Sequence, residues 1–310
     1  MTEQSNRHYS AFKGEITKHL SLKSGDLFVD LTLGDGGHTQ EALEAGCKVI
    51  SFDVDPQSIE RATFFLKDIA KPQLLTSDSK PDTLFKNSNW VIINTNFINF
   101  LSEINKHSIK AVNKILVDLG PSQNQVLNEN RGFSFNSNAL LDMRIDPTLS
   151  VTAKDLINVL NEGELRELFL LADETYAKPL AKSIVNFRKT APITTCKQLA
   201  TLISSVKHSA VGKIHPATKV FMSLRMAVNS ERENIKQLLQ LIPQALAADG
   251  VAGIITFHST EDRVVKESIK DLTQKNLVFA INKKPIEPSI EELKNSMRTR
   301  SAKLRLIKKC

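Results

Sequence analysis

The chain has 310 residues, a formal net charge of +7, 41% hydrophobic residues and 24% charged residues. This length suggests about two domains, and the composition is that of a globular protein, which excludes a disordered or fibrous chain. The moderate basic excess permits a polyanionic partner without requiring one.

The cysteines and the N-terminal segment indicate the compartment. Cys47, Cys196 and Cys310 lie far apart and form no CxxC pair, so we expect neither a disulfide framework nor a zinc ribbon. Such usage favours a reducing, cytoplasmic compartment. The polar N-terminal segment lacks the apolar stretch of a signal peptide. No apolar run approaches the roughly 18 residues that a membrane-spanning helix needs, so we expect no membrane association.

The first third of the chain alternates strand-like and helix-like segments. Short apolar runs rich in β-branched and aromatic residues predict strands at 27–32, 48–53, 90–94 and 114–119. Between them we expect a short helix at 41–45 and a helix over 97–108. Asp55 and Pro56 predict the start of another helix, with an N-cap and a proline at the first position. This order predicts a parallel sheet covered by helices on both faces.

The middle of the chain, from Thr152 to about Val228, has little strand signal. Successive helical periods predict helices that start at Thr152 and near Gly163 or Glu164, and further helices over 174–189 and 194–206. We therefore expect a helical insertion, placed at 131–217, between two parts of one α/β domain at 1–130 and 218–310.

The α/β pattern resumes after the insertion. A long amphipathic helix is expected at 231–248, followed by a turn at Asp249 and a strand at 251–257. The alternating segment 302–307 predicts an edge strand that carries Lys303 and Arg305 outward.

The glycine-rich segment after the first strand is the strongest local signal. The run DLTLGDGGH (30–38) contains Gly36, Gly37 and His38; its glycines permit a tight turn and close approach of a ligand, at the N-terminus of a helix. Asp53 ends the next strand, where a carboxylate can accept both ribose hydroxyls of an adenosine ligand. The third glycine of the dinucleotide fingerprint GxGxxG is absent, which favours S-adenosylmethionine over NAD or FAD. A plain glycine turn is the remaining alternative.

Two later strands end in polar residues that are candidate catalytic groups, Asp118 and His258. The carboxyl ends of parallel strands line the ligand crevice of an open sheet, which places both near a bound cofactor. A loop cap at Asp118 and a capping box at Ser259 or Thr260 are the structural alternatives. The chain has no GxSxG elbow of a hydrolase, and its isolated histidines predict no metal site.

Seven segments together resemble a known family. In chain order they are GDGGHT, LVDLGPSQNQ, RGFSF, LDMRID, IHPATKVFMSLRMAVNSE, FHSTEDRVVK and RSAKLRL. Over 25–305 the chain is similar to the bacterial 16S ribosomal RNA cytosine-N4 methyltransferases. The resemblance implies a class I, Rossmann-like methyltransferase fold with an inserted helical domain for RNA recognition. It also implies methyl transfer from S-adenosylmethionine to the N4 amine of one cytosine in the decoding centre of the small ribosomal subunit.

The resemblance also assigns site residues by motif. The cofactor-binding residues that it implies are Gly36, Gly37 and His38 for the amino-acid end, Asp53 for the ribose, Phe97 for the adenine side, and Asp118 and Gln125 to complete the pocket. Asp118 is the first candidate acceptor at the target amine and His258 the second. Basic residues in or beside the motifs are candidates for RNA contacts, namely Arg131, Arg144, Lys213, His215, Lys219, Arg225 and Arg263. Each can instead be a solvated surface charge, and Arg144 can pair with Asp142 or Asp146.

The chain departs from the family pattern at three places. The loop after Asp118 reads GPSQNQ where the family has two serines, an insertion segment reads LADETY, and the N-terminal motif is reduced to HYSAF. Two other functions share this fold. A DNA or other RNA amino-methyltransferase is disfavoured because DLGP replaces a DPPY-type motif. A catalytically silent ribosome assembly factor is disfavoured because GDGGH, Asp53 and Asp118 are intact.

Overall fold

The computed structural model describes residue 7 and residues 9–76, 78–80, 84–207 and 215–310. The chain divides into two units. One unit comprises Met1–Gly120 and Glu233–Cys310, and we call it the sheet unit; the other comprises Pro121–Arg232, and we call it the helical unit. No helix among the described residues is long and apolar enough to span a membrane.

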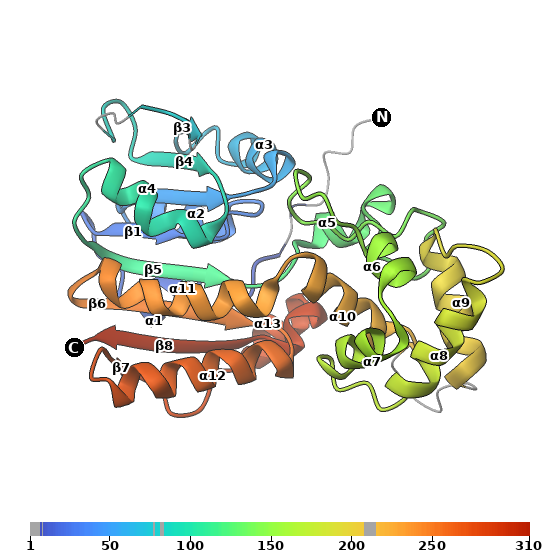
Figure 1. Cartoon of the computed structure of the whole chain (residues 1–310). Helices are drawn as coiled ribbons and strands as arrows, with labels where there is room; N and C mark the ends of the chain where they lie inside the picture. Colours follow the sequence, from blue (N-terminus) through green and yellow to red (C-terminus); the bar gives the residue numbers. More distant parts are fainter. Residues whose placement is uncertain (1–6, 8, 77, 81–83, 208–214) are drawn as a thin grey trace. The chain divides into compact units, whose positions relative to one another are not determined.

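The sheet unit is built on one eight-stranded sheet with the order β3-β4-β2-β1-β5-β6-β8-β7 (Figure 1). The strands are β1 (Leu27–Asp30), β2 (Lys48–Asp53), β3 (Gln73–Thr76), β4 (Trp90–Asn94), β5 (Val112–Asp118), β6 (Leu246–Thr256), β7 (Val278–Ala280) and β8 (Lys303–Lys309). Strands β1 to β6 pair in parallel, whereas β8 pairs antiparallel with β6 and β7. Strand β1 lies between β2 and β5, so the strand order reverses there, and such a switch point forms a ligand crevice at the carboxyl ends of the strands.

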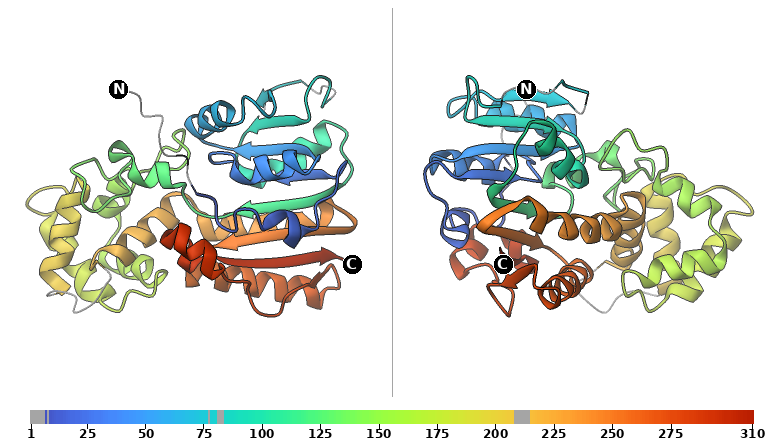
Figure 2. Two further views of the ribbon diagram at one scale, coloured as in Figure 1. Left: turned by 180° about the vertical axis from the view of Figure 1, so that it is seen from behind. Right: turned by 60° about the vertical axis from the view of Figure 1, so that its left-hand side comes forward.

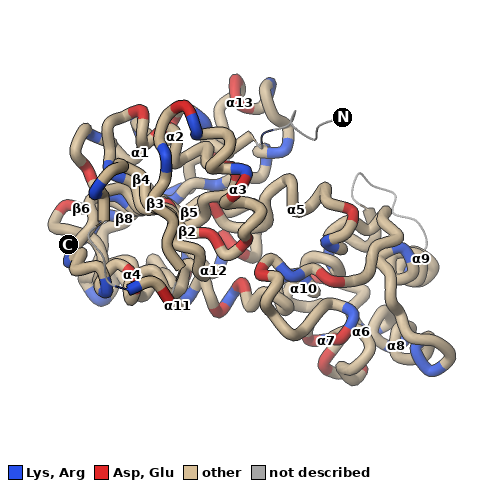
Figure 3. The backbone as a smooth tube through the Cα atoms, turned by 90° about the horizontal axis from the view of Figure 1, so that it is seen from above, with Lys and Arg blue, Asp and Glu red and all other residues tan. Residues whose placement is uncertain are grey.

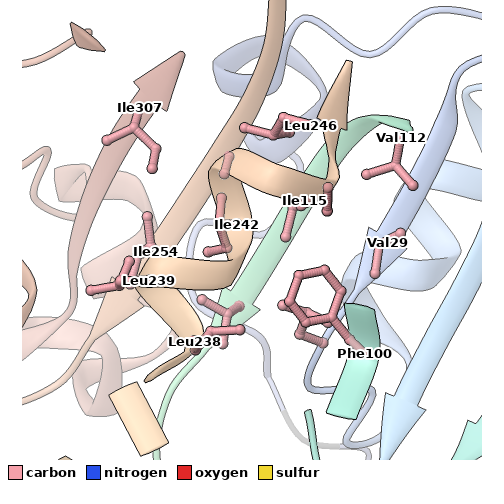
Figure 4. Close-up of a cluster of buried hydrophobic side chains, with 14 of the residues drawn as sticks. Val29, Phe100, Val112, Ile115, Leu238, Leu239, Ile242, Leu246, Ile254 and Ile307 are labelled. Atoms are coloured by element: carbon pink, nitrogen blue, oxygen red, sulfur yellow. The ribbon is translucent and has the colours of Figure 1, made fainter. Parts of the chain in front are cut away.

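Helices cover both faces of this sheet (Figure 2). They are α1 (Ile16–Leu20), α2 (Gly37–Glu44), α3 (Pro56–Phe65), α4 (Phe100–Lys106), α11 (Glu231–Ala245), α12 (Ser259–Gln274) and α13 (Ile290–Asn295), with 3₁₀ turns η1 (Phe97–Asn99) and η3 (Met297–Ser301). Alternate residues of the strands point to opposite faces. In β1, for example, Val29 lies in one cluster with Phe100 of α4 and Leu238 of α11 (Figure 4), and Phe28 lies in another with residues of α1, α2 and α3. Burial on both faces explains why the strands read as continuous apolar runs.

The helical unit has its own core. Its helices are α5 (Gln123–Leu127), η2 (Glu129–Arg131), α6 (Ala153–Val159), α7 (Glu162–Leu170), α8 (Ala177–Phe187), α9 (Cys196–Lys207) and α10 (Thr218–Val228). Capping boxes at Thr152 and Asn161 start α6 and α7, because each side chain accepts from the third helical N–H. Buried residues such as Ile157, Phe169 and Leu199 form one apolar cluster.

Most predicted elements are confirmed, and several details differ. Strands β3 and β7 were not predicted, α2 begins at Gly37 rather than at Glu41, and β8 is an interior strand rather than an edge strand. The helix expected at 231–248 ends at Ala245, and the expected turn at Asp249 lies within β6, because residues 246–250 belong to that strand. Arg305 does not point outward, because its guanidinium is buried against Asp262, with N–O distances of 2.7 and 3.1 Å.

The helical unit also extends beyond the predicted range 131–217 at both ends. The physical reason is α10. Its residues Val220 and Leu224 pack into the core of the helical unit, so the boundary follows that helix rather than preceding it.

Candidate active site

The glycine-rich loop connects β1 to α2 and has two positions that exclude a side chain. Gly36 has φ +78° and is the N-cap of α2, a backbone conformation that glycine adopts readily. A Cβ at Gly37 would lie 2.1 Å from the Oγ of Ser10, which is closer than atoms can approach. The loop is therefore shaped by local packing, and it presents the first turn of α2 at the carboxyl edge of the sheet.

Asp53 organises the end of β2. One carboxylate oxygen accepts the N–H of Gly34 at 2.9 Å, and the other accepts the N–H of Asp55 at 2.9 Å. The side chain is partly exposed, yet the surrounding protein withdraws the carboxyl from water, and this burial raises the pKa of Asp53 to about 7 against the lowering effect of the two N–H donors. Each oxygen retains a further lone pair, so Asp53 can accept two ligand hydroxyls without losing these bonds.

His38 and Asp118 form a buried pair between α2 and the end of β5. His38 Nε2 lies 3.5 Å from the Asp118 carboxylate, an ion pair rather than a well-formed hydrogen bond. Burial opposes a charge on His38, but Asp118, Asp30 and Glu41 outweigh it and raise the pKa of the imidazole. Among the described residues, neither ring nitrogen of His38 nor Oδ1 of Asp118 has a hydrogen-bond partner. Buried polar atoms are normally satisfied, so this pair offers Oδ1 of Asp118 and Nδ1 of His38 to a ligand.

A chain of buried hydrogen bonds supports this loop, and sequence reasoning missed it. The indole N–H of Trp90 donates to Ser51 Oγ at 3.0 Å, Ser51 lies 2.8 Å from Thr39 Oγ1, and Thr39 donates to Asp30 at 2.7 Å. Because the indole can only donate, the donors all run toward Asp30. Burial raises the pKa of Asp30, and the bonds from Thr39 and Thr32 oppose that rise. The chain thus ties β4, β2 and α2 to the end of β1.

Both ring nitrogens of His258 are bonded to Glu261 in the first turn of α12. As N-cap of α12 it accepts the Glu261 N–H at Nδ1 (3.3 Å), while its Nε2 lies 2.7 Å from the Glu261 carboxylate. This arrangement requires the proton on Nε2 and leaves neither nitrogen as an acceptor for a substrate amine. The second Glu261 oxygen accepts the N–H of Phe257. The nearby hydroxyls of Thr256 and Thr260 are buried, and among the described residues they have no hydrogen-bond partner.

The structure also places the two remaining predicted cofactor residues. Phe97 begins η1, with two residues between it and the end of β4, and is partly buried against the core of the sheet unit. Gln125 belongs to the helical unit, where its side-chain oxygen accepts the N–H of Ser122 in a capping box.

The basic residues predicted to contact RNA are largely engaged in internal bonds. Arg131 donates to the carbonyls of residues 144 and 145, Arg144 pairs with Asp142 at 2.7 Å, and Arg225 pairs with Glu231 at 2.8 Å. His215 stacks on Phe135 with ring centroids 4.1 Å apart. Lys219 donates to the carbonyl of residue 173, Arg263 is exposed on α12, and Lys213 lies outside the described residues.

Comparisons with known proteins cover almost the whole chain. Residues 5–310 match the MraW methylase family. A protein from Sulfurihydrogenibium sp. (strain YO3AOP1), named ribosomal RNA small subunit methyltransferase H, is 36% identical over 307 residues, covering 96% of this chain and 98% of its own. Proteins of the same name from Hydrogenobaculum sp. (strain Y04AAS1) and Borreliella afzelii (strain PKo) are 39% and 38% identical. They cover 98% and 95% of this chain, and 96% and 94% of their own lengths.

Proposed function

This chain belongs to the MraW methylase family, and from that premise we propose that it methylates the N4 amine of a cytosine in small-subunit ribosomal RNA, with S-adenosylmethionine as methyl donor. The observation that carries the proposal is the ion pair of His38 and Asp118 beside the glycine-rich loop, in which His38 Nδ1 and Asp118 Oδ1 are buried and have no hydrogen-bond partner among the described residues. Unsatisfied buried polar groups are costly, and a ligand with a carboxylate and an amine satisfies them.

The residues of the sheet unit fit the parts of this cofactor. Asp53 has the acceptor capacity for the two ribose hydroxyls, and its bonds to Gly34 and Asp55 hold it in place. Gly36 and Gly37 bring the first N–H groups of α2 to the amino-acid end, together with His38. We assign the adenine side to Phe97 and the remaining contacts to Asp118, whereas Gln125, which the motif also suggested, lies in the helical unit. When bound, S-adenosylmethionine supplies a methyl group on a positively charged sulfur.

The acceptor amine needs orientation more than a strong base. Because the lone pair of the cytosine amine is delocalised into the ring, a positioned hydrogen-bond acceptor helps to direct it. Asp118 has a buried oxygen with no protein partner among the described residues, whereas both nitrogens of His258 are engaged with Glu261. We therefore assign the acceptor role to Asp118 and a positioning role to His258.

The RNA substrate follows from the names of the relatives. A cytosine in a folded RNA must leave its stack to reach the cofactor, and we assign recognition of the surrounding RNA to the helical unit. Since ribosomal RNA is the substrate, we expect the protein to act in the cytoplasm. The intact Asp53 and Asp118 favour an active enzyme over a silent assembly factor.

The test uses small ribosomal subunits from a strain that lacks this modification. Incubation with labelled S-adenosylmethionine, followed by digestion to nucleosides, should place the label on N4-methylcytidine. Asp118→Asn should lower kcat by about 10²-fold, and His258→Ala should affect it less. Label on adenine or at carbon 5 of cytosine, or a preference for DNA, would refute the substrate. Cofactor binding without any transfer would favour the silent assembly factor.

A further inference from the structure

Charge is unevenly distributed along the helical unit. Residues 175–230 contain nine Lys and Arg residues and no Asp or Glu, whereas acidic residues are frequent between 129 and 174. In Figure 3, α8 and α9 carry blue segments, and the red segments gather around α7. A stretch of this length with a single sign of charge is the electrostatic footprint of a polyanion-binding surface.

Bonds within the unit leave only some of these cations available. Lys207 pairs with Glu174 at 2.8 Å, and Arg188 donates to the carbonyls of residues 157 and 160. Lys219 and Arg225 are engaged as described above. The lysines that remain are exposed, and within the described part of the chain none lies within ion-pair distance of a carboxylate: Lys178, Lys182, Lys189 and Lys197. Lys189 donates to Asn186 Oδ1 at 3.2 Å, and two of its three N–H groups remain for a phosphate. All four lie on α8, just after it, or in the first turn of α9.

A groove of about 530 Å³ has one of these lysines, Lys197, in its lining. Phe187, at the end of α8, forms its aromatic wall and is 38% exposed, and Lys197 contributes the charge. Asn138 and Gln198 supply amides. The oxygen of Gln198 accepts the N–H groups of residues 194 and 195, so its NH₂ group is the part left to donate outward. These groups suit the parts of a nucleotide: the aromatic ring can stack on the plane of a base, the amides can hydrogen-bond to the edge of the base, and the cation can bind a phosphate.

We propose that this α8–α9 face, made of the four lysines and the groove, is where the RNA substrate docks: the lysines hold backbone phosphates, and the groove takes one unpaired base stacked on Phe187. The inference rests on the proposed function and adds a contact surface on the helical unit that is separate from the residues assigned to methyl transfer. An acidic protein segment would also pair with lysines, but it offers no planar base to the aromatic wall and the amides.

The experiment compares two triple variants with the same change in charge. Lys182→Gln/Lys189→Gln/Lys197→Gln removes three cations from the α8–α9 face. Lys18→Gln/Lys71→Gln/Lys275→Gln removes three exposed lysines that are scattered over the sheet unit. Binding to unmodified small subunits and to protein-free 16S rRNA is measured over a range of salt concentrations, with steady-state kinetics, calorimetric cofactor binding and thermal unfolding measured alongside.

The α8–α9 variant should bind RNA at least tenfold more weakly at physiological salt. The slope of log K against log salt should become shallower by about 2–3, since each phosphate contact contributes roughly 0.7–0.9. The KM for the RNA should rise, while kcat and cofactor affinity remain unchanged. Phe187→Ala should weaken binding by roughly tenfold, as expected for loss of base stacking, and Phe187→Tyr should restore it. The scattered variant should behave as the wild type.

Three outcomes would overturn the docking face. They are an unchanged salt slope and KM in the α8–α9 variant, an equal loss in the scattered variant, or a loss with intact subunits but not with protein-free RNA. The last result would place a ribosomal protein against the lysines. These outcomes differ from failure of the proposed function, in which the wild-type protein itself transfers no methyl group to cytosine.

Discussion

Asp53 provides a direct test of the cofactor site, because one substitution should change both the affinity and its pH dependence. In the free protein its carboxyl has a pKa of about 7 and holds the N–H groups of Gly34 and Asp55. Ribose hydroxyls donate to the ionised carboxylate, so binding favours the ionised form and lowers this pKa. The affinity should therefore rise with pH and level off above 7. Only about one-tenth of the carboxyls are ionised at pH 6, and the affinity there should be roughly tenfold lower than at pH 8.

Asp53→Asn keeps the side-chain shape but leaves one acceptor oxygen instead of two. Loss of one charge-assisted hydrogen bond costs about 1.5–3 kcal/mol, which corresponds to a loss of affinity between about 10-fold and 150-fold at pH 8. Asp53→Ala is a poorer probe, because it also removes the acceptors that hold the turns at Gly34 and Asp55. The asparagine variant keeps one of these two acceptors, so it should lose less stability in thermal unfolding than the alanine variant.

Calorimetric titration with S-adenosylmethionine at pH 6, 7 and 8, in buffers of different ionisation enthalpy, measures both quantities. At pH 7 the wild type should release about half a proton more per cofactor bound than the variant. Subtracting the variant's profile removes the contributions of His38 and of the cofactor's own amine, which both proteins share. If wild type and variant show the same pH profile and the same proton release, Asp53 does not bind the ribose as its ionised form.

Two further predictions concern packing in the sheet unit. Gly37→Ala should lower the free energy of unfolding by about 1–3 kcal/mol, because its Cβ would overlap Ser10 Oγ. In the double variant, Ser10→Gly should restore most of that loss. If denaturant unfolding shows that the losses of the two single variants simply add, the overlap is refuted. Arg305→Met should cost about 3 kcal/mol, because it leaves the buried Asp262 with only Lys303 at 3.5 Å. Lys308→Gln, at an exposed pair with Asp249, should change the unfolding temperature very little, and an equal effect of both substitutions would refute the role of burial.

The elements that the sequence predicts well have strong local signals. Strands β2 and β4 have the predicted bounds because each is a continuous apolar run that is buried on both faces. Helix α3 begins where Asp55 and Pro56 place it, and the Asp55 side chain accepts the N–H of residue 57. Strand β3 was missed for the opposite reason. It has four residues, lies at the sheet edge and is half exposed, so only pairing with β4 stabilises it as a strand.

In the candidate site, too, the features with a local sequence signal are the ones that could be predicted. The sequence predicts which residues end the strands, and a parallel sheet then brings those ends to one edge, as with Asp53 and Asp118. It does not predict the bonds among hydroxyls. Ser51 and Thr39 have no sequence signature, and their link from Trp90 to Asp30 exists only because β4, β2 and α2 pack side by side.

The position of a basic residue in a family motif is a poor predictor of a contact with RNA. Arg144 pairs with an aspartate only two residues away, and Arg225 pairs with Glu231 six residues later. Both arginines therefore stabilise local structure, and their place in a motif does not by itself indicate a contact with RNA. The lysines at 182, 189 and 197 lie outside the motifs, in a stretch without carboxylates, and they remain exposed. A cation whose donors are held by internal carboxylates or carbonyls has fewer donors left for a phosphate. The docking face that we propose therefore follows from the distribution of acidic residues along the chain as well as from the positions of the basic ones.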